Sequence, residues 1–170
     1  MKSIVLLITG KPRSGKDTFH LILKNIGYTV TNYSLADNAK EVCRHLGIEP
    51  KDKPNDYRKL LSDIKIALDN YNNFNVKSAI NLIKHKIGEV EFICIQAREE
   101  KDINFIKNYF GDNPNLAVYS LLVVRDVCEG TYGNIADDNI NFETDITIVN
   151  NDTYNDYVRN ISNLASFLSH

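Results

Sequence analysis

The amino-acid sequence predicts an α/β fold in which a five-stranded parallel sheet carries helices on both faces. Short apolar runs alternate along the chain with segments whose apolar residues recur at helical spacing. The run 90–97 is almost continuously apolar, which is typical of a parallel strand covered on both faces. Residues 10–16, rich in glycine and basic residues, join the first apolar run to the first helical segment. This order of elements indicates strands that are connected by right-handed crossovers.

Two strand–helix pairs begin the chain. In order, they are the strand 4–8, the helix 17–25, the strand 28–35 and the helix 36–46. The strands are rich in β-branched, aliphatic and aromatic residues, and the helices carry apolar residues three or four positions apart. Each helix is followed by a glycine, Gly27 or Gly47, a residue that favours the end of a helix. Two prolines in the segment 48–55 then indicate a loop.

Three strands and four helices follow. In order, they are the helices 56–71 and 76–87, the strand 90–97, the helix 101–110, the strands 117–124 and 144–149, and the helix 155–168. Apolar residues at helical or strand-like spacing support each segment. A polar break at 70–75 separates the two consecutive helices, and a polar loop at 125–141 separates the last two strands.

Length and composition indicate one domain of ordinary character. The chain has 170 residues, too few for two ordinary domains. Its net charge of -2 gives no electrostatic attraction to nucleic acid or to an anionic membrane, so neither is expected as a partner. No apolar run approaches the roughly 20 residues of a membrane span, and we expect a cytoplasmic protein. The chain has three widely spaced cysteines, Cys43, Cys94 and Cys128, and this odd number and spacing argue against a disulfide framework and a cysteine-bound metal site. Cys94 lies in an apolar run and is expected in the core.

Residues 10–16 read Gly-Lys-Pro-Arg-Ser-Gly-Lys and predict a loop that binds phosphate groups. Two glycines allow the chain to turn back so that successive backbone N–H groups converge on phosphate oxygens. The helix that follows adds the positive end of its dipole. Lys16 is placed to reach the outer phosphates of a nucleoside triphosphate. The candidate nucleotide-binding residues of this loop are Gly10, Lys11, Arg13, Ser14, Gly15 and Lys16.

Asp17 follows the loop at a position where serine or threonine more often holds Mg²⁺, and Thr18 comes next. A carboxylate here would bind Mg²⁺ directly or through water, with Thr18 as a weaker oxygen ligand. The alternative interpretation is an acidic residue that interacts favourably with the dipole at the start of a helix. We favour the metal role for Asp17 and Thr18.

Charged residues follow the expected strands at the edge where an open parallel sheet binds its ligands. Beyond the phosphate loop, these residues are Asp37 and Lys40 after the second strand, Arg98 after the third and Arg125 after the fourth. A guanidinium group can hold a phosphate through two hydrogen bonds, which favours phosphate contacts for Arg98 and Arg125. Arg58, at the start of a later helix, can also reach over the site. For each arginine, the alternative is a solvated residue or a surface ion pair.

With these residues, the chain resembles the phage-type deoxynucleoside monophosphate kinases, within the wider group of P-loop nucleoside monophosphate kinases. The sequence Gly-Lys-Pro-Arg-Ser-Gly-Lys-Asp-Thr is similar to the loop of this family and includes the aspartate that the family carries in place of serine or threonine. Weaker similarities follow at 34–40, 58–64, 97–98 and 145–151. The resemblance implies the three-layer P-loop kinase fold in a single domain, residues 1–170. It also implies an acceptor-binding helical region at about 36–88 and a lid-like loop at about 125–141.

The resemblance further implies phosphoryl transfer from ATP, with Mg²⁺, to a nucleoside or deoxynucleoside monophosphate. The catalytic residues would be Lys16, Arg98 and Arg125, and Asn150 in the turn behind the last strand would join the phosphate loop in binding ATP. The acceptor would contact Asp37, Lys40, Arg58, Gln96 and Arg98. Gln96 departs from the family, whose members commonly carry an acidic residue two positions before this arginine.

Two alternative functions remain open. Gln96 and a lid segment with only one arginine are also compatible with a nucleotide-binding protein that lacks kinase activity and acts as a switch or partner module. The second alternative is a kinase with another acceptor, such as dephospho-coenzyme A or phosphomevalonate, because related groups share the Gly-Lys-Asp loop. The expected partners are nucleotide substrates, and the expected assembly is a monomer or a homodimer.

Overall fold

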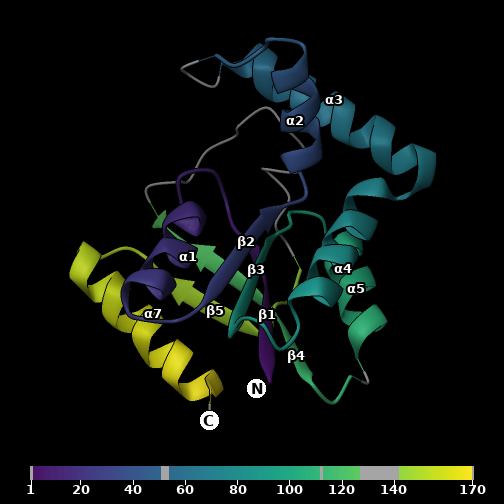
Figure 1. The fold of residues 1–170 in the computed structure, drawn as a ribbon. Helices are drawn as coiled ribbons and strands as arrows, with labels where there is room; N and C mark the ends of the chain where they lie inside the picture. Colours follow the sequence, from purple (N-terminus) through teal and green to yellow (C-terminus); the bar gives the residue numbers. More distant parts are fainter. Residues whose placement is uncertain (1, 51–53, 112, 127–141, 170) are drawn as a thin grey trace.

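The computed structural model describes residues 2–50, 54–111, 113–126 and 142–169. Five parallel strands form one sheet in the order β2-β3-β1-β4-β5, which confirms the predicted fold class (Figure 1). The strands are β1 (Ser3–Thr9), β2 (Val30–Ser34), β3 (Phe92–Gln96), β4 (Leu116–Val124) and β5 (Ile146–Val149). Because β1 is the central strand, the loop that follows it emerges in the middle of the sheet's carboxyl edge.

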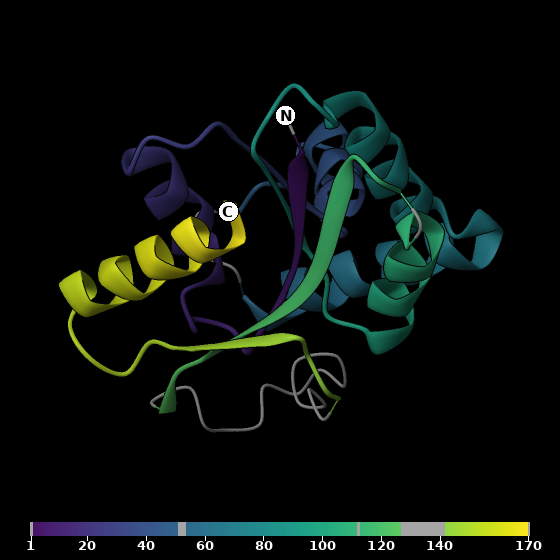
Figure 2. The same ribbon diagram turned by 90° about the horizontal axis from the view of Figure 1, so that it is seen from below.

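Helices cover both faces of the sheet. They are α1 (Lys16–Asn25), α2 (Asp37–His45), α3 (Asn55–Asn72), α4 (Phe74–Lys86), α5 (Glu100–Phe110) and α7 (Tyr154–Ser169). α1 and α7 lie on one face, and α4 and α5 lie on the other (Figure 2). α2 and α3 contact each other beyond the carboxyl end of β2 (Figure 1). The structure therefore has the three layers that the sequence predicts.

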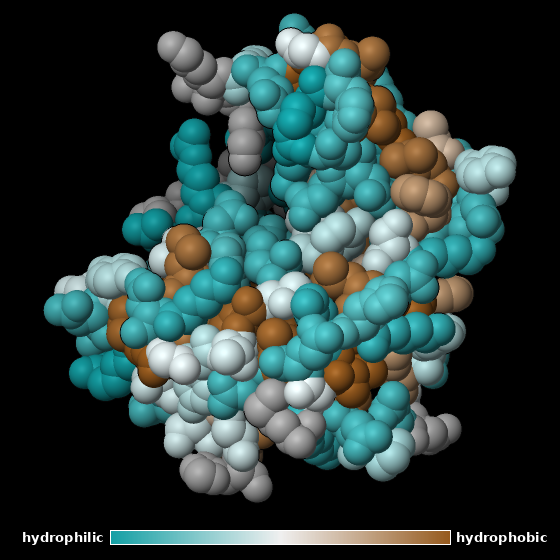
Figure 3. All heavy atoms as spheres, viewed as in Figure 1, coloured by the Kyte–Doolittle hydropathy of each residue, from teal (hydrophilic) through white to brown (hydrophobic). Residues whose placement is uncertain are grey.

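The helices beyond the sheet differ from those that cover it. α3 has no fully buried residue, and Ile66 and Tyr71 on this helix are exposed. In Figure 3, apolar side chains lie at the upper end of this face, over α2 and α3, and further apolar patches lie lower on the same face. No helix within the described ranges is long and apolar enough to cross a membrane. α3 thus contributes no fully buried side chain to the core.

The alternation of side chains along β1 divides the hydrophobic core into two clusters. Ile4, Leu6 and Ile8 belong to the cluster under α1 and α7. Val5 and Leu7 belong to the cluster under α4 and α5. All five side chains are at most 5% exposed, so β1 is covered on both faces as a central parallel strand must be.

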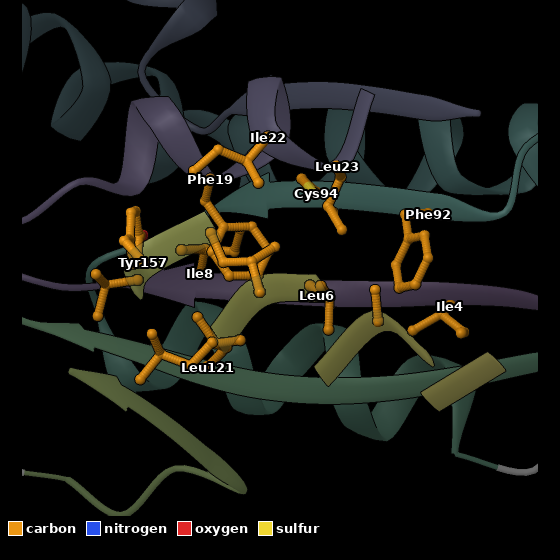
Figure 4. Packing of buried hydrophobic residues seen from close by; sticks show 14 residues of the cluster. Ile4, Leu6, Ile8, Phe19, Ile22, Leu23, Phe92, Cys94, Leu121 and Tyr157 are labelled. Atoms are coloured by element: carbon orange, nitrogen blue, oxygen red, sulfur yellow. The ribbon is translucent and has the colours of Figure 1, made fainter. Parts of the chain in front are cut away.

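The first cluster attaches the helix after the phosphate loop to the sheet. Phe19 and Leu23 of α1 pack over β1 and β3, where Phe92 and Cys94 lie (Figure 4). Burial raises the pKa of the Cys94 thiol to about 12, so the side chain is neutral. Its burial confirms Cys94 as a core residue, whereas Cys128 lies outside the described residues.

The junction between α3 and α4 is shorter than the sequence predicts. A polar break was expected over 70–75, but α3 continues to Asn72 and α4 begins at Phe74. Asn73 alone makes the turn, with a φ of 49° in the left-handed region that asparagine tolerates. Asn75, expected in the break, is a buried helical residue whose side-chain amide donates to Asp69. The prediction was wrong because only Asn73 of this polar stretch makes a turn, whereas the polar side chain of Asn75 forms a buried hydrogen bond inside a helix.

The packing of α1 makes a testable prediction about stability. Phe19 is fully buried in the first cluster, so Phe19→Ala removes its contacts and leaves a cavity beneath the phosphate loop. We expect the free energy of unfolding to fall by about 3–5 kcal/mol in urea denaturation. Phe167→Ala is the control, because this side chain of α7 is 78% exposed and its loss should change the free energy by less than about 0.5 kcal/mol. Equal effects of the two substitutions would contradict this account of the core.

Candidate phosphate-binding site

The phosphate loop turns back over the end of β1 through two glycines with positive φ. Gly10 has a φ of 148°, and a Cβ atom there would lie 2.5 Å from the carbonyl oxygen of Val123 in β4. Gly15 has a φ of 111°, and its Cβ would lie 2.6 Å from Nδ2 of Asn150. Arg13 also adopts the left-handed region, with a φ of 65°. The loop is therefore pressed against the carboxyl ends of two neighbouring strands, with no room for side chains at either glycine.

Lys16 lies over the turn that it follows. Its side chain is largely buried, and Nζ donates hydrogen bonds to the carbonyl oxygens of Gly10 and Lys11, at 2.5 and 2.6 Å. The buried hydroxyl of Ser14 has no hydrogen-bond partner among the described residues. A buried polar group without a partner is costly, and a ligand held by the loop would relieve that cost. Both observations fit a cradle for an anionic group.

A pocket of about 280 Å³ opens beside the loop. One side of it is formed by the loop and the first turn of α1, with Arg13, Gly15, Lys16, Asp17 and Thr18. The other side comes from the ends of β4 and β5 and the start of α7, with Arg125, Asn150, Asp152, Tyr154 and Tyr157. The structure thus gathers three of the predicted loop residues, Arg13, Gly15 and Lys16, around one cavity with the predicted metal ligands, Arg125 and Asn150, whereas Gly10, Lys11 and Ser14 do not line it.

Two side chains from the C-terminal part of the chain hold the backbone of the loop. Asn150 donates from Nδ2 to the carbonyl oxygen of Ser14 at 2.9 Å, and Tyr157 donates from its hydroxyl to that of Gly15 at 3.2 Å. Burial raises the pKa of Tyr157, so its hydroxyl stays protonated and remains a donor. Asn150 was predicted for this site. Tyr157 was not predicted for this site, and its hydrogen bond to the loop depends on how α7 packs against α1.

Asp152 and Tyr154 also line the pocket and were not predicted. Asp152 lies in the short connection between β5 and α7, and Tyr154 is the first residue of α7. Neither belongs to a sequence motif that would predict a binding residue. The connection is placed by neighbouring hydrogen bonds: Asn150 N–H donates to the carbonyl oxygen of Val124, and Asn151 exchanges hydrogen bonds with Asp126. These bonds tie the end of β4, and with it Arg125, to the turn after β5.

Asp17 and Gln96 are in direct contact. The side-chain amide of Gln96, at the end of β3, donates to Oδ1 of Asp17 at 3.0 Å. Asp17 is exposed in the first turn of α1, and Thr18 lines the same pocket. A neutral amide orients the carboxylate without adding a second negative charge to it. The residue that departs from the family pattern therefore contacts the candidate metal ligand.

The donor set suits magnesium shared with a phosphate ligand. Kinase sites commonly hold Mg²⁺ through one or two carboxylates together with substrate phosphates and water. Asp17 offers a carboxylate and Thr18 a hydroxyl at the mouth of the loop. Within the described residues there is no group of three or more His, Cys, Asp or Glu side chains that could enclose a metal by itself. The residues present fit Mg²⁺ and do not form an all-protein metal site.

The predicted acceptor-binding residues lie outside this pocket. Asp37 accepts from the backbone N–H of Ser34 at 2.8 Å and forms an ion pair with Lys40 at 2.7 Å. These two charges thus offset each other at the start of α2. Arg98 is exposed two residues after the end of β3, and Arg58 is half-buried in the first turn of α3. The structure brings Gln96 into contact with Asp17 but does not bring either arginine into the pocket beside the loop.

Comparison with known proteins identifies the fold but not a sequence family. No protein-family model matches the sequence, and no curated protein sequence matches it significantly. The TT1252 protein of Thermus thermophilus superposes with a TM-score of 0.54 at 18% identity, over 99% of this chain and 98% of the other.

Two solved kinases superpose over similar lengths. The APS kinase of Mycobacterium tuberculosis, in complex with AMPPNP and APS, has a TM-score of 0.52 at 11% identity and covers 99% of both chains. Shikimate kinase of Aquifex aeolicus has a TM-score of 0.52 at 14% identity, over 97% of this chain and 98% of the other. At these identities the likeness shows the fold alone. The chain has the three-layer fold of P-loop kinases.

The close packing of the loop predicts a selective effect of Gly15→Ala. The new Cβ would displace Asn150, which holds the loop, so we expect the affinity for the ATP analogue AMPPNP to fall at least about tenfold in calorimetry, the equivalent of 1.4 kcal/mol. Gly27→Ala is a matched control because Gly27 has a similar φ of 105° but nothing within 4 Å of its Cβ position. Both variants bear the strain of positive φ, roughly 1–2 kcal/mol, but only the first should bind AMPPNP more weakly. Equal affinities would contradict the role of the loop.

Proposed function

We propose that the protein transfers a phosphoryl group from ATP to a nucleoside or deoxynucleoside monophosphate. The observation that carries this proposal is the phosphate loop, with Lys16 lying over it, at the central carboxyl edge of a P-loop kinase fold. The base pocket proposed for ATP is the cavity beside the loop, between Arg125, Asn150 and Tyr154. The similarity of the chain to phage-type deoxynucleoside monophosphate kinases extends beyond the loop to 34–40, 58–64, 97–98 and 145–151, and it supports the choice of acceptor.

The proposed binding of ATP is supported by hydrogen-bond donors that are already in place. Backbone N–H groups of the loop and the amino end of α1 would bind the phosphates, and Lys16 would exchange its bonds to loop carbonyls for bonds to phosphate oxygens. Arg125, held beside the turn after β5, would contact the nucleotide from the other side of the pocket. Magnesium, held by Asp17 and Thr18, would offset negative charge on the phosphates.

The acceptor side is proposed for the region 36–88 together with the end of β3. Arg58 and Arg98 would bind the acceptor phosphate, with Asp37 and Lys40 nearby on α2. Phosphoryl transfer needs little covalent chemistry from the protein, since positioning and charge stabilisation supply most of the catalysis. In this proposal Gln96 orients Asp17, so an acidic residue at position 96 is not required.

The proposal also concerns the organisation of the chain. Residues 1–170 would form one kinase domain, and the segment 125–141 would serve as a lid over the nucleotide. Of that segment, Arg125 and Asp126 are described, and 127–141 lie outside the described residues. We further propose a cytoplasmic protein that acts on nucleotide substrates as a monomer or a homodimer.

A coupled assay of ADP release tests the proposed activity. With ATP and Mg²⁺, we expect turnover of at least one member of a panel that contains the common ribonucleoside and deoxynucleoside monophosphates. Lys16→Ala should lower kcat/KM by about 100-fold or more, because it removes a charge that stabilises the transferring group. Lys24→Ala, at the exposed far end of the same helix, is the control and should leave kcat/KM near the wild-type value.

Other outcomes of this assay would contradict the proposed acceptor. Binding of AMPPNP without turnover of any acceptor would favour a nucleotide-binding protein without kinase activity. Turnover of dephospho-coenzyme A or phosphomevalonate, but of no nucleoside monophosphate, would assign the same chemistry to a different acceptor.

The contact between Gln96 and Asp17 predicts a magnesium-dependent effect of Asp17→Asn. The substitution keeps an oxygen for Gln96 but removes the negative charge, so the Mg²⁺ concentration that half-saturates AMPPNP binding should rise roughly tenfold. Calorimetric titration at a series of Mg²⁺ concentrations measures this shift. Asp56→Asn is the matched control, because Asp56 is an exposed acid in the first turn of α3. If both variants only lowered the melting temperature, the role of Asp17 would be confined to the helix dipole.

A further inference from the structure

Lys65 is the centre of an ionic cluster that lies away from the nucleotide pocket. Its Nζ atom is 2.7 Å from Oε1 of Glu99, 3.0 Å from Oδ2 of Asp69 and 3.3 Å from Oδ2 of Asp102. The side chain of Lys65 is 17% exposed, and that of Asp102 is 6% exposed. Burial alone would lower the pKa of Lys65, but its bond to Glu99 and the charges of Asp102 and Glu99 raise it, so Lys65 stays protonated. We call Lys65, Asp69, Glu99 and Asp102 the Lys65 cluster.

One side of the cluster fixes the backbone next to Arg98. Glu99 follows Arg98 directly and is the N-cap residue that immediately precedes α5. Its carbonyl oxygen accepts from the backbone N–H groups of Asp102 and Ile103, so Glu99 and Asp102 belong to one turn. Lys65 binds the carboxylates of both residues. The side chain of Lys65 on α3 therefore holds the start of α5, next to the short connection from β3 that carries Arg98.

The other side of the cluster fixes the helix that carries Arg58. Arg58 precedes Lys65 by seven residues on α3, which is about two helical turns or roughly 10 Å along the same face. Fully buried Asn75 at the start of α4 strengthens this anchor. Its side-chain amide donates to Oδ1 of Asp69 at 2.8 Å and to the carbonyl oxygen of Lys65 at 3.2 Å. The contact is notable because α3 has no fully buried residue of its own.

We infer that Lys65 is a positioning residue that holds Arg58 and Arg98 in a fixed relation to each other, so that both reach the acceptor phosphate. This inference rests on the proposed function, in which these two arginines bind the acceptor. A buried ion pair contributes little net stability compared with well-packed apolar residues, but it imposes a specific geometry. A lysine that joins α3 to the first turn of α5 supplies that geometry between the two arginine-bearing segments.

The inference predicts a selective change in acceptor binding. In Lys65→Met, the KM for the best nucleoside monophosphate of the panel should rise roughly tenfold or more, because small displacements of binding groups are costly. The KM for ATP should change less than about twofold, since the phosphate loop and its pocket contain no member of the cluster. Glu99→Ala is the second variant. It breaks the link to Lys65 but leaves Asp69 and Asp102 as partners of the lysine, so it should shift the acceptor KM in the same direction while the protein remains folded.

Lys59→Met is the matched control. Lys59 lies on the same helix and forms an ion pair with Asp63 at 2.7 Å, but its side chain is 76% exposed. Its removal should leave both KM values unchanged. If the wild type turned over a monophosphate while Lys65→Met and Glu99→Ala kept its acceptor KM, the inference would be overturned and the proposed function retained. If Lys65→Met failed to fold, Glu99→Ala would decide. If the wild type turned over no monophosphate, the proposed function would fail, and this inference with it.

Discussion

The close approach of the phosphate loop to the ends of β4 and β5 is the contact on which the site depends. A Cβ atom at Gly10 would clash with the carbonyl oxygen of Val123, and one at Gly15 would clash with the side chain of Asn150. Only residues without a Cβ fit at these two places and also adopt positive φ without strain. The hydrogen bonds from Asn150 and Tyr157 then hold the loop in this position. The loop is thus shaped by the last third of the chain, far from it in sequence.

Two attachments meet near the carboxyl end of β3, one to the proposed donor side and one within the proposed acceptor side. Gln96 at the end of β3 donates to Asp17 at the start of α1, which links two central strands through their following segments. The Lys65 cluster links α3 to the start of α5, immediately after Arg98. Each attachment involves a residue within three positions of the end of β3. The carboxyl end of this strand therefore relates the nucleotide pocket to the arginine-bearing helix.

Much of the fold was predictable because the strands obey simple burial rules. β1 and β3 are apolar on both faces and lie in the interior of the sheet, whereas all residues of the edge strand β2 are only partly buried, as its mixed composition suggests. The loop glycines and Lys16 were predictable because phosphate binding restricts residue types at fixed spacing. Asn73 and Asn75 show where prediction from local sequence fails. Both belong to one polar stretch, yet one makes a turn through its backbone and the other fills a buried position in a helix.

The sequence alone determined the α/β class, the order of strands and helices along the chain, and the phosphate loop with its lysine. These features depend on local periodicity and on residues that are close together in the chain. Only the tertiary structure decided that Tyr157 caps the loop, that Gln96 orients Asp17 and that Lys65 joins two segments 34 residues apart. Such contacts depend on how the helices pack against one another. The sequence around a polar residue on a helix does not indicate which partner that packing brings to it.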